Sequence, residues 1–308
     1  MMKGLVFKST GSWYAVRVES GEILECRIKG RFRIEGIKTT NPVVVGDQVE
    51  INIRPDGTPV IEKILSRKNY IIRKATNLSK EVHIIAANLD QAILVATIHH
   101  PDTSPVFIDR FLVAAEAYSI PAVILWNKTD LYDQEELVML EALMKEYRKI
   151  GYPCICTSAT EGTGVEALRV LLKDKISVLS GLSGVGKSTL INLVEPGLSL
   201  KTAPISLSHR SGKHTTTFAE MFPLTAGGYI IDTPGLRAFG LFQMEKGEIS
   251  HYFPEIFKAA SGCRYYNCTH THEPGCAVLE AVVNGEISES RFCSYMNMFE
   301  ESDEKYRT

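Results

Sequence analysis

The chain has 308 residues, of which 44% are hydrophobic and 23% are charged, as expected for a soluble globular protein of two or three domains. No apolar run approaches the roughly 20 residues needed to span a bilayer, so no membrane-spanning helix is expected. The N-terminus lacks the basic start and apolar core of a signal peptide, so we expect a cytoplasmic location. Seven cysteines in a reducing compartment favour metal binding over disulfides.

The net charge of −2 is unevenly distributed. Residues 1–75 carry a net charge of +6, whereas residues 76–245 and 246–308 each carry −4. Only the first segment therefore has the positive charge that is typical of a segment that binds nucleic acid. A solvated basic face is the alternative interpretation.

Residues 1–75 predict about five short strands and no helix. Alternating or β-branched runs mark these strands, which are separated by Gly, Asp and Pro turns: "WYAVRV" (13–18), "EILECRI" (22–28), "NPVVVGDQVEINI" (41–53) and "VIEKIL" (60–65). So many strands in this length predict a small barrel of the OB-fold type, with another small β-barrel as the alternative. The basic stretch "KGRFR" (29–33) is the expected contact for RNA phosphates.

From about residue 84 to residue 245 the pattern changes to alternating strands and helices. The apolar runs of strand length are 91–98, 121–126, 152–159, 175–180 and 227–232. The segments of helical period between them are 108–119, 134–150, 164–172 and 189–194. This alternation is typical of a parallel sheet with helices on both faces, and it defines an α/β domain over residues 76–245.

The first motif in this domain is "NKTD" (127–130), which follows an apolar strand. The Asp130 carboxylate can accept from N1–H and from the exocyclic amine of guanine, whereas adenine has neither donor there. Asn127 can bond the other edge of the base, and the stem of Lys128 can cover the ring. In "TSA", the backbone of Ser158 and Ala159 can contact the guanine oxygen. Each of these two motifs is weak by itself.

The second motif, "GLSGVGKS" (181–188), fits the pattern G-x-x-x-x-G-K-[ST] between an apolar strand and a helix. Its glycines let backbone N–H groups surround phosphate oxygens at a helix N-terminus. Lys187 can reach the β- and γ-phosphates, and the Ser188 hydroxyl can ligate Mg²⁺. The expected nucleotide contacts here are Gly181, Ser183, Gly184, Val185, Gly186, Lys187, Ser188 and Thr189.

The third motif, "DTPG" (232–235), ends a strand 45 residues after Lys187. Asp232 can hold Mg²⁺ through water, and the Gly235 N–H can contact a γ-phosphate. Alone, this tetrapeptide is often only a turn. Between the two motifs lies "SHRSGKHTTTFAE" (208–220), in which one threonine can complete the Mg²⁺ coordination; Thr216 is favoured over its two neighbours, and an exposed loop is the alternative.

These motifs are mutually consistent but occur in a rotated order. An ordinary G domain runs from phosphate loop through threonine loop and "DTPG" to the base motif and "TSA". Here the base motif and "TSA" come first. The arrangement predicts a circularly permuted GTPase domain, a change that is tolerated where termini lie close together.

The tail, residues 246–308, contains a candidate metal site followed by two segments of helical period. The spacing C-x₄-C-x-H-x₅-C supplies three thiolates and one imidazole, a closed tetrahedral set typical of structural zinc: Cys263, Cys268, His270 and Cys276. His272 is a rival for His270, and free cysteines near a turn are the alternative. The remaining cysteines are expected to be buried or half-buried: Cys26, Cys154, Cys156 and Cys293.

With its permuted motifs between a small barrel and a Cys/His cluster, the whole chain resembles the RsgA family (also called YjeQ or EngC), the circularly permuted GTPases of small-ribosomal-subunit maturation. The resemblance implies an N-terminal OB-fold, a GTPase domain and a C-terminal zinc-binding domain, and it favours His270 over His272 as the zinc ligand. It also implies GTP hydrolysis stimulated by the small subunit, with the flanking domains contacting ribosomal RNA. We expect a monomer that binds GTP or GDP, one structural Zn²⁺ and, with GTP, Mg²⁺.

One position departs from many GTPases. Leu236 stands directly after "DTPG", where a glutamine often orients the attacking water, so slow intrinsic turnover is expected. His214 is the candidate for this role, as the resemblance also suggests; an exposed loop histidine is the alternative. Two other functions compete: an RNA-binding module with nucleotide as a structural cofactor, and a nucleotide-dependent enzyme such as a kinase.

Overall fold

The computed structural model describes residues 1–10, 12–28, 42–74, 82–198, 220–232 and 244–304. The stretch "KGRFR", the threonine loop with His214 and Thr216, and Gly235 with Leu236 lie outside these ranges. The chain forms two compact units. The first consists of Met1–Ile93, Gly164–Ser180 and Gly186–Ala238, and the second of Leu94–Thr163, Gly181–Val185 and Phe239–Thr308. No helix within the described ranges is long and apolar enough to cross a membrane.

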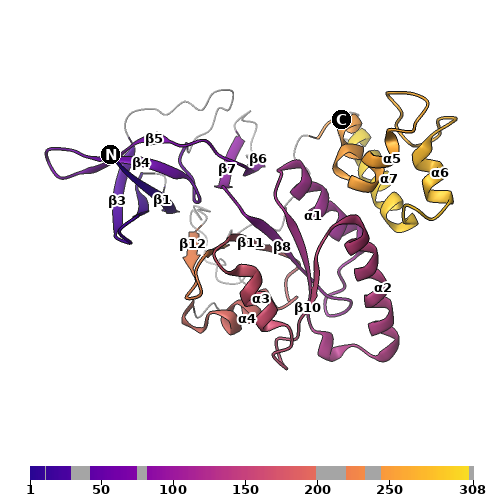
Figure 1. Cartoon of the computed structure of the whole chain (residues 1–308), viewed down its shortest axis with the longest axis horizontal. Helices are drawn as coiled ribbons and strands as arrows, with labels where there is room; N and C mark the ends of the chain where they lie inside the picture. Colours follow the sequence, from indigo (N-terminus) through magenta and orange to yellow (C-terminus); the bar gives the residue numbers. More distant parts are fainter. Residues whose placement is uncertain (11, 29–41, 75–81, 199–219, 233–243, 305–308) are drawn as a thin grey trace. The chain divides into compact units, whose positions relative to one another are not determined.

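The first unit begins with a five-stranded barrel, drawn from indigo to purple in Figure 1. Its strands are β1 (Met2–Ser9), β2 (Tyr14–Val18), β3 (Ile23–Ile28), β4 (Gln48–Ile53) and β5 (Pro59–Ile64). The order β1-β2-β3-β5-β4, closed by pairing of β4 with β1, is that of an OB-fold, which confirms the expected barrel. Its interior is apolar, with Val6, Tyr14, Val16, Val49, Ile51 and Ile61 among the buried side chains.

A two-stranded sheet that the sequence did not predict follows the barrel. Strand β6 (Tyr70–Lys74) pairs antiparallel with β7 (Val82–Ala87). Its two isoleucines, Ile71 and Ile72, are adjacent instead of alternating, and the register of the pair shifts between them. A bulge of this kind explains why the period-2 pattern of a strand is missing here.

The first unit also contains the part of the α/β fold that carries the phosphate motifs. Strand β11 (Ile176–Ser180) pairs in parallel with β13 (Tyr229–Asp232), and β12 (Glu220–Pro223) pairs antiparallel with β13. Helices α3 (Val165–Leu172) and α4 (Lys187–Val194) contact each other, and η2 (Pro196–Leu198) follows α4. Strand β1 of the barrel pairs with β12, with Lys8 opposite Glu220.

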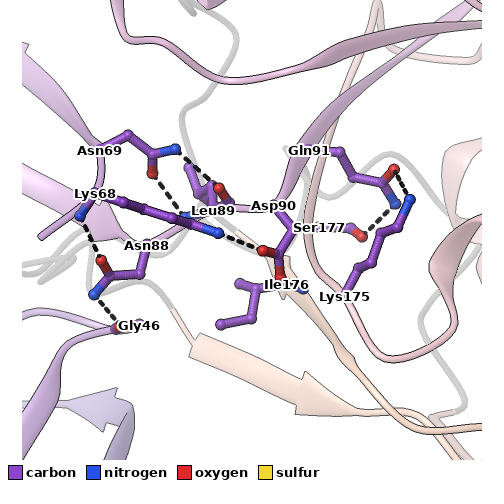
Figure 2. Close-up of polar contacts among 10 residues, drawn as sticks. All are labelled: Gly46, Lys68, Asn69, Asn88, Leu89, Asp90, Gln91, Lys175, Ile176 and Ser177. Carbon is purple, nitrogen blue, oxygen red and sulfur yellow. Dashed lines mark hydrogen bonds and ion pairs between the residues drawn. The ribbon is translucent and has the colours of Figure 1, made fainter.

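A network of polar side chains joins the barrel to these strands, as Figure 2 shows. The Asn69 amide makes paired bonds with the backbone of Leu89, donating to its carbonyl at 2.9 Å and accepting from its N–H at 2.8 Å. The Asn88 amide donates to the Gly46 carbonyl of the barrel at 2.8 Å. Asp90 accepts from the N–H of Ile176 in β11 at 2.7 Å. The network satisfies backbone groups that would otherwise be buried without partners.

Gly46 is required in this network for steric reasons. It has a φ of +88°, and a Cβ at this position would lie 1.9 Å from the carbonyl oxygen of Ala87. Only glycine therefore permits the barrel to approach β7 this closely.

The second unit contains the strand that carries the base motif. Strand β9 (Ala122–Trp126) pairs in parallel with β10 (Cys154–Cys156), and β8 (Gln91–Ala96) passes from the first unit into the second. Helix α1 (Pro105–Ala117) starts at an Ser104 cap, and α2 (Gln134–Ile150) starts at a capping box and ends at a left-handed glycine. These observations confirm the predicted alternation of strands and helices.

The tail of the chain lies in the second unit and is helical. It consists of η4 (Lys246–Tyr252), α5 (Pro254–Ala260), α6 (Ala277–Val283) and α7 (Glu289–Glu304), in orange and yellow in Figure 1. Phe253, Ile256, Tyr295 and Met298 form the core of this region, and Val113 from α1 belongs to the same cluster. One expectation is wrong here: Cys293 on α7 is exposed, not buried or half-buried.

Candidate nucleotide and metal sites

Asn127 links the base motif to the phosphate loop within the second unit. It follows β9 directly and is fully buried, and its backbone N–H donates to the Ala96 carbonyl at 2.9 Å. Its Nδ2 donates to the Val185 carbonyl oxygen at 2.8 Å, and its Oδ1 accepts from the Thr157 hydroxyl at 3.0 Å. The side chain is thus held on both sides, across 58 residues of sequence.

Asp130 lies in the short helix η1 (Thr129–Leu131), immediately after Lys128. Its Oδ1 is buried and has no hydrogen-bond partner among the described residues. A buried carboxylate oxygen without a donor carries a desolvation cost, which a donor from a bound ligand would offset. Lys128 adopts a left-handed conformation with φ +64°, which turns the chain between Asn127 and Asp130.

The "TSA" segment forms a tight turn after β10. Ser158 is buried, its backbone N–H donates to Thr163 at 3.0 Å, and its hydroxyl accepts from the Glu161 N–H at 3.0 Å. Ala159 follows in the same turn and is half-buried. The bond from the Thr157 N–H to the Trp126 carbonyl, at 2.7 Å, holds this turn beside the strand that carries the base motif.

The phosphate loop has the backbone that its glycines predict. Gly181 has a φ of +140°, and a Cβ there would lie 2.3 Å from the Val95 carbonyl oxygen. Gly186 has a φ of +96° and precedes the first turn of α4. Within the loop and this turn, Val185 is buried, Lys187 and Ser188 are half-buried, and Ser183, Gly184 and Thr189 are exposed.

Asp232 ends the strand next to the one that leads into this loop. β11 and β13 are parallel neighbours in register at Val178 and Ile231, so both carboxyl ends meet at one edge of the sheet in the first unit. Ligands of open α/β sheets bind at such an edge. The other residues expected to assist there, His214, Thr216 and Gly235, lie outside the described residues.

The tail brings together the four predicted metal ligands. The ligand atoms of Cys263, Cys268, His270 and Cys276 all lie within 4.8 Å of one another. The Cys263 and Cys276 sulfurs are 3.9 Å apart, and they lie 3.6 and 3.5 Å from His270 Nδ1. Tetrahedral zinc requires about 3.8 Å between two sulfurs and about 3.6 Å between sulfur and nitrogen, so the residues fit this ion.

His272, the rival ligand, is outside this cluster. Its Nδ1 is bonded to the Thr271 hydroxyl at 2.7 Å. Burial lowers the pKa of His270, which favours the neutral imidazole that a metal needs, and burial raises the pKa of the Cys268 thiol to about 12. A bound divalent cation would reverse this effect on the thiol, because the thiolate is the ligand.

The structure adds three supporting residues that the sequence did not single out. Thr157 orients Asn127, as described above. The Glu273 carboxylate accepts from the N–H groups of Thr269 and Thr271 at 2.7 and 3.1 Å and so fixes the loop around His270. The buried Tyr132 hydroxyl donates to the Asn127 carbonyl at 2.8 Å. Thr157 is the first residue of "TSA", so it lies within a recognisable motif. Nothing in the sequence distinguishes the other two from ordinary surface or core residues.

Family models and relatives agree with this geometry. The model described as RsgA GTPase matches residues 64–242, and the model described as RsgA N-terminal domain matches residues 3–61. The protein named small ribosomal subunit biogenesis GTPase RsgA 2 from Bacteroides thetaiotaomicron is 58% identical over 307 residues, covering 99% of both chains. The protein with the same name, without the number, from Porphyromonas gingivalis is 54% identical over 312 residues, covering 99% of both.

Two solved structures are similar over nearly the whole chain. The crystal structure of YjeQ from Thermotoga maritima is 40% identical with a TM-score of 0.80, covering 98% of both chains. YloQ, described as a circularly permuted GTPase, is 30% identical with a TM-score of 0.78, covering 99% of this chain and 96% of its own. The chain combines a permuted order of motifs with a barrel and a Cys/His cluster, and it is similar to these proteins in sequence and fold over nearly its whole length. It belongs to the RsgA family of GTPases.

Proposed function

We propose that this protein hydrolyses GTP as a late-stage maturation and checkpoint factor of the small ribosomal subunit, and that the subunit stimulates this hydrolysis. The observation that best supports a nucleotide site is the hydrogen bond from the Asn127 side chain to the Val185 carbonyl. This bond joins the base motif to the phosphate loop, although the loop comes later in the chain. The biological role rests on relatives named small ribosomal subunit biogenesis GTPase.

Guanine selection is assigned to the Asp130 carboxylate. Its buried Oδ1 has no partner among the described residues, and N1–H or the exocyclic amine of guanine would supply the missing donor. Adenine presents no donor in that place, so this carboxylate would remain unpaired with ATP. Leaving a buried charged acceptor unpaired is costly, which supports strong discrimination.

Phosphate binding is assigned to the start of α4 and to the end of β13. The Lys187 ammonium would neutralise the β- and γ-phosphates, and the backbone around Gly184 and Gly186 would donate to their oxygens. The hydroxyls of Ser188 and Thr216 and, through water, the carboxylate of Asp232 have the oxygen chemistry that Mg²⁺ prefers. When bound, Mg²⁺ would supply neutralisation of the charge that develops on the phosphates.

For the hydrolysis step, this chain lacks the glutamine that often orients the attacking water directly after "DTPG". Leu236 cannot orient water, so His214 is proposed to do so in the complex with the small ribosomal subunit. The imidazole would accept a hydrogen bond from the attacking water and hold it in line with the γ-phosphate. Turnover without the subunit should therefore be slow.

The three segments are proposed to have separate roles. Residues 1–75 would form an RNA-binding barrel, residues 76–245 the permuted GTPase domain, and residues 246–308 a domain stabilised by one structural zinc ion. Four protein ligands leave no open coordination position, so this zinc has no catalytic role. A basic barrel would contribute affinity for ribosomal RNA more than sequence specificity. We propose that the protein acts as a cytoplasmic monomer.

The test is GTP turnover with and without purified small ribosomal subunits, with large subunits as the control. Stimulation by small subunits alone is the expected result. Equal turnover in all three conditions would favour the competing function, an RNA-binding module with nucleotide as a structural cofactor. That alternative has no need of the full set Lys187, Ser188 and Asp232, which this chain retains.

A further inference from the structure

The segment between β8 and α1, residues 97–104, makes a hydrogen bond with the lysine of the base motif. The Lys128 ammonium donates a hydrogen bond to the main-chain carbonyl of His100. Both residues belong to the second unit. The lysine ammonium therefore has a protein partner that does not depend on a bound nucleotide.

The His100 carbonyl is held in place by the surrounding segment. Thr97 exchanges bonds with Thr103: its N–H donates to the Thr103 hydroxyl at 3.1 Å, and its carbonyl accepts from the Thr103 N–H at 3.0 Å. The Thr97 hydroxyl donates to the Pro101 carbonyl at 2.5 Å. These bonds close the segment on itself on both sides of His100.

A second set of bonds fixes the segment relative to the base motif. The Tyr132 hydroxyl, which is buried, accepts from the Ile98 N–H at 2.9 Å and donates to the Asn127 carbonyl at 2.8 Å. One phenol thus connects the backbone of Ile98, two residues before His100, with the backbone of Asn127.

The backbone of His100, more than its imidazole, provides this contact. His100 has a φ of +55°, in the left-handed region that few side chains other than Gly, Asn and Asp adopt readily. Its side chain is exposed. A substitution at this position should therefore act through the backbone conformation it permits.

We propose that His100 is a positioning residue for guanine-nucleotide binding, and that its carbonyl holds the Lys128 stem in the extended position that covers the purine ring. This inference rests on the nucleotide site proposed above and adds a residue to it. Ordering a long flexible side chain on binding lowers affinity, and a side chain that is ordered beforehand avoids that loss. Because the contact concerns the base, it should affect GDP and GTP equally and leave the chemical step unchanged.

The test compares the affinity of the full chain for labelled GDP and GTP across variants at position 100. His100→Val, whose β-branched side chain disfavours a positive φ, should weaken both nucleotides about fivefold with kcat unchanged. His100→Gly and His100→Asn permit this φ and should restore affinity to within about twofold of the original. Asp102→Val, in the same exposed segment, is the matched control for a new β-branched residue and should bind normally.

A double variant separates positioning from a general disturbance of the fold. Lys128→Met keeps an aliphatic stem over the base but removes the ammonium. Adding His100→Val to Lys128→Met should cause no further loss, because the bond is already absent. Additive losses, or normal affinity in His100→Val, would overturn the proposal. Failure of the unaltered protein to bind GDP would instead refute the nucleotide site itself.

Discussion

Arg291 on α7 and Asp109 on α1 form an ion pair in the interior of the second unit, at 2.7 Å and with exposed fractions of 1% and 0%. Arg291 also bonds Glu255 at 2.7 Å, and the Tyr147 hydroxyl donates to Asp109 at 3.0 Å. Burial raises the pKa of Asp109, and the Arg291 charge opposes that effect. The tail is therefore anchored to α1 by charged groups as well as by apolar packing.

Arg291→Met should destabilise the second unit by about 3–5 kcal/mol, because it leaves the buried Asp109 charge unpaired. A folded-state pKa above the unfolded value means that the folded state binds the proton more tightly, so stability falls as pH rises. Removing Arg291 raises this pKa further, and the loss should be larger at about pH 8 than at about pH 5. Urea unfolding followed by Trp126 fluorescence in a Trp13→Phe background measures it.

The matched control is Asp109→Asn combined with Arg291→Met, which leaves no uncompensated charge at Asp109. This double variant should recover part of the stability and lose most of the pH dependence. A double variant as unstable as Arg291→Met at both pH values would contradict the unpaired charge as the cause.

Cys268→Ser should remove the metal from the tail. Zinc bound to purified protein, measured by mass spectrometry, should fall from about one ion per chain to a small fraction, because a serine hydroxyl replaces a thiolate ligand. Cys293→Ser is the control, since Cys293 is exposed and outside the cluster. Full zinc content in Cys268→Ser would show that these four residues are not the ligand set.

Asp130→Asn should change the base that the protein binds. The amide can donate to the additional oxygen of xanthine, but it can accept from only one of the two donors of guanine, and its NH₂ group then faces the exocyclic amine. Affinity for GDP should fall by about 100-fold and affinity for xanthosine diphosphate should rise, because hydrogen bonds to a charged acceptor are among the strongest. Asp133→Asn, at the cap of the next helix, should change neither affinity, since asparagine caps equally well. Unaltered GDP affinity in Asp130→Asn would contradict the assignment.

Asn69→Ala should destabilise the first unit by about 2 kcal/mol. It removes both bonds to Leu89 and leaves its N–H and carbonyl buried without these partners. Urea unfolding followed by Trp13 fluorescence in a Trp126→Phe background gives the value. Asn52→Ala, at an exposed position of the barrel, should cost less than about 0.5 kcal/mol. Equal losses in the two variants would mean that the network contributes nothing specific.

His214→Ala should abolish the stimulation of hydrolysis by small subunits and leave GTP affinity within a few-fold. The reason is that an imidazole orients water in the transition state without being needed to hold the nucleotide. Single-turnover hydrolysis with small subunits, together with GTP titration, distinguishes the two effects. Unchanged stimulated turnover would exclude His214 as the group that orients water.

The elements predicted most accurately were those with strong periodicity. The predicted helix over 134–150 coincides with α2, since its apolar period, its capping box and the final glycine all agree. Four ligands within 14 residues were predictable as a metal set, because chain proximity alone brings them together. The base motif and the phosphate loop were recognisable because backbone geometry and chemistry restrict which residues can serve there.

The contacts that could not be predicted join distant segments through ordinary residues. Asp109 and Arg291 are separated by 182 residues, and neither belongs to a motif. The acceptor for Lys128 at position 100 is a backbone carbonyl, which every residue has, so the sequence does not reveal this contact. The positive φ of His100 is seen only in the structure. The pairing of β6 with β7 depends on a bulge that removes the alternating pattern. Each of these is decided by tertiary packing.

The most direct test of the central claim, that a rotated set of motifs forms a guanine-nucleotide site, is a competition titration. Labelled GDP bound to the unaltered protein is displaced by unlabelled GDP or by ADP. The Asp130 carboxylate loses two donors with adenine, so ADP should compete at least about 100-fold less well. Competition by ADP within a few-fold of GDP would contradict the assignment of "NKTD" as the base-reading motif.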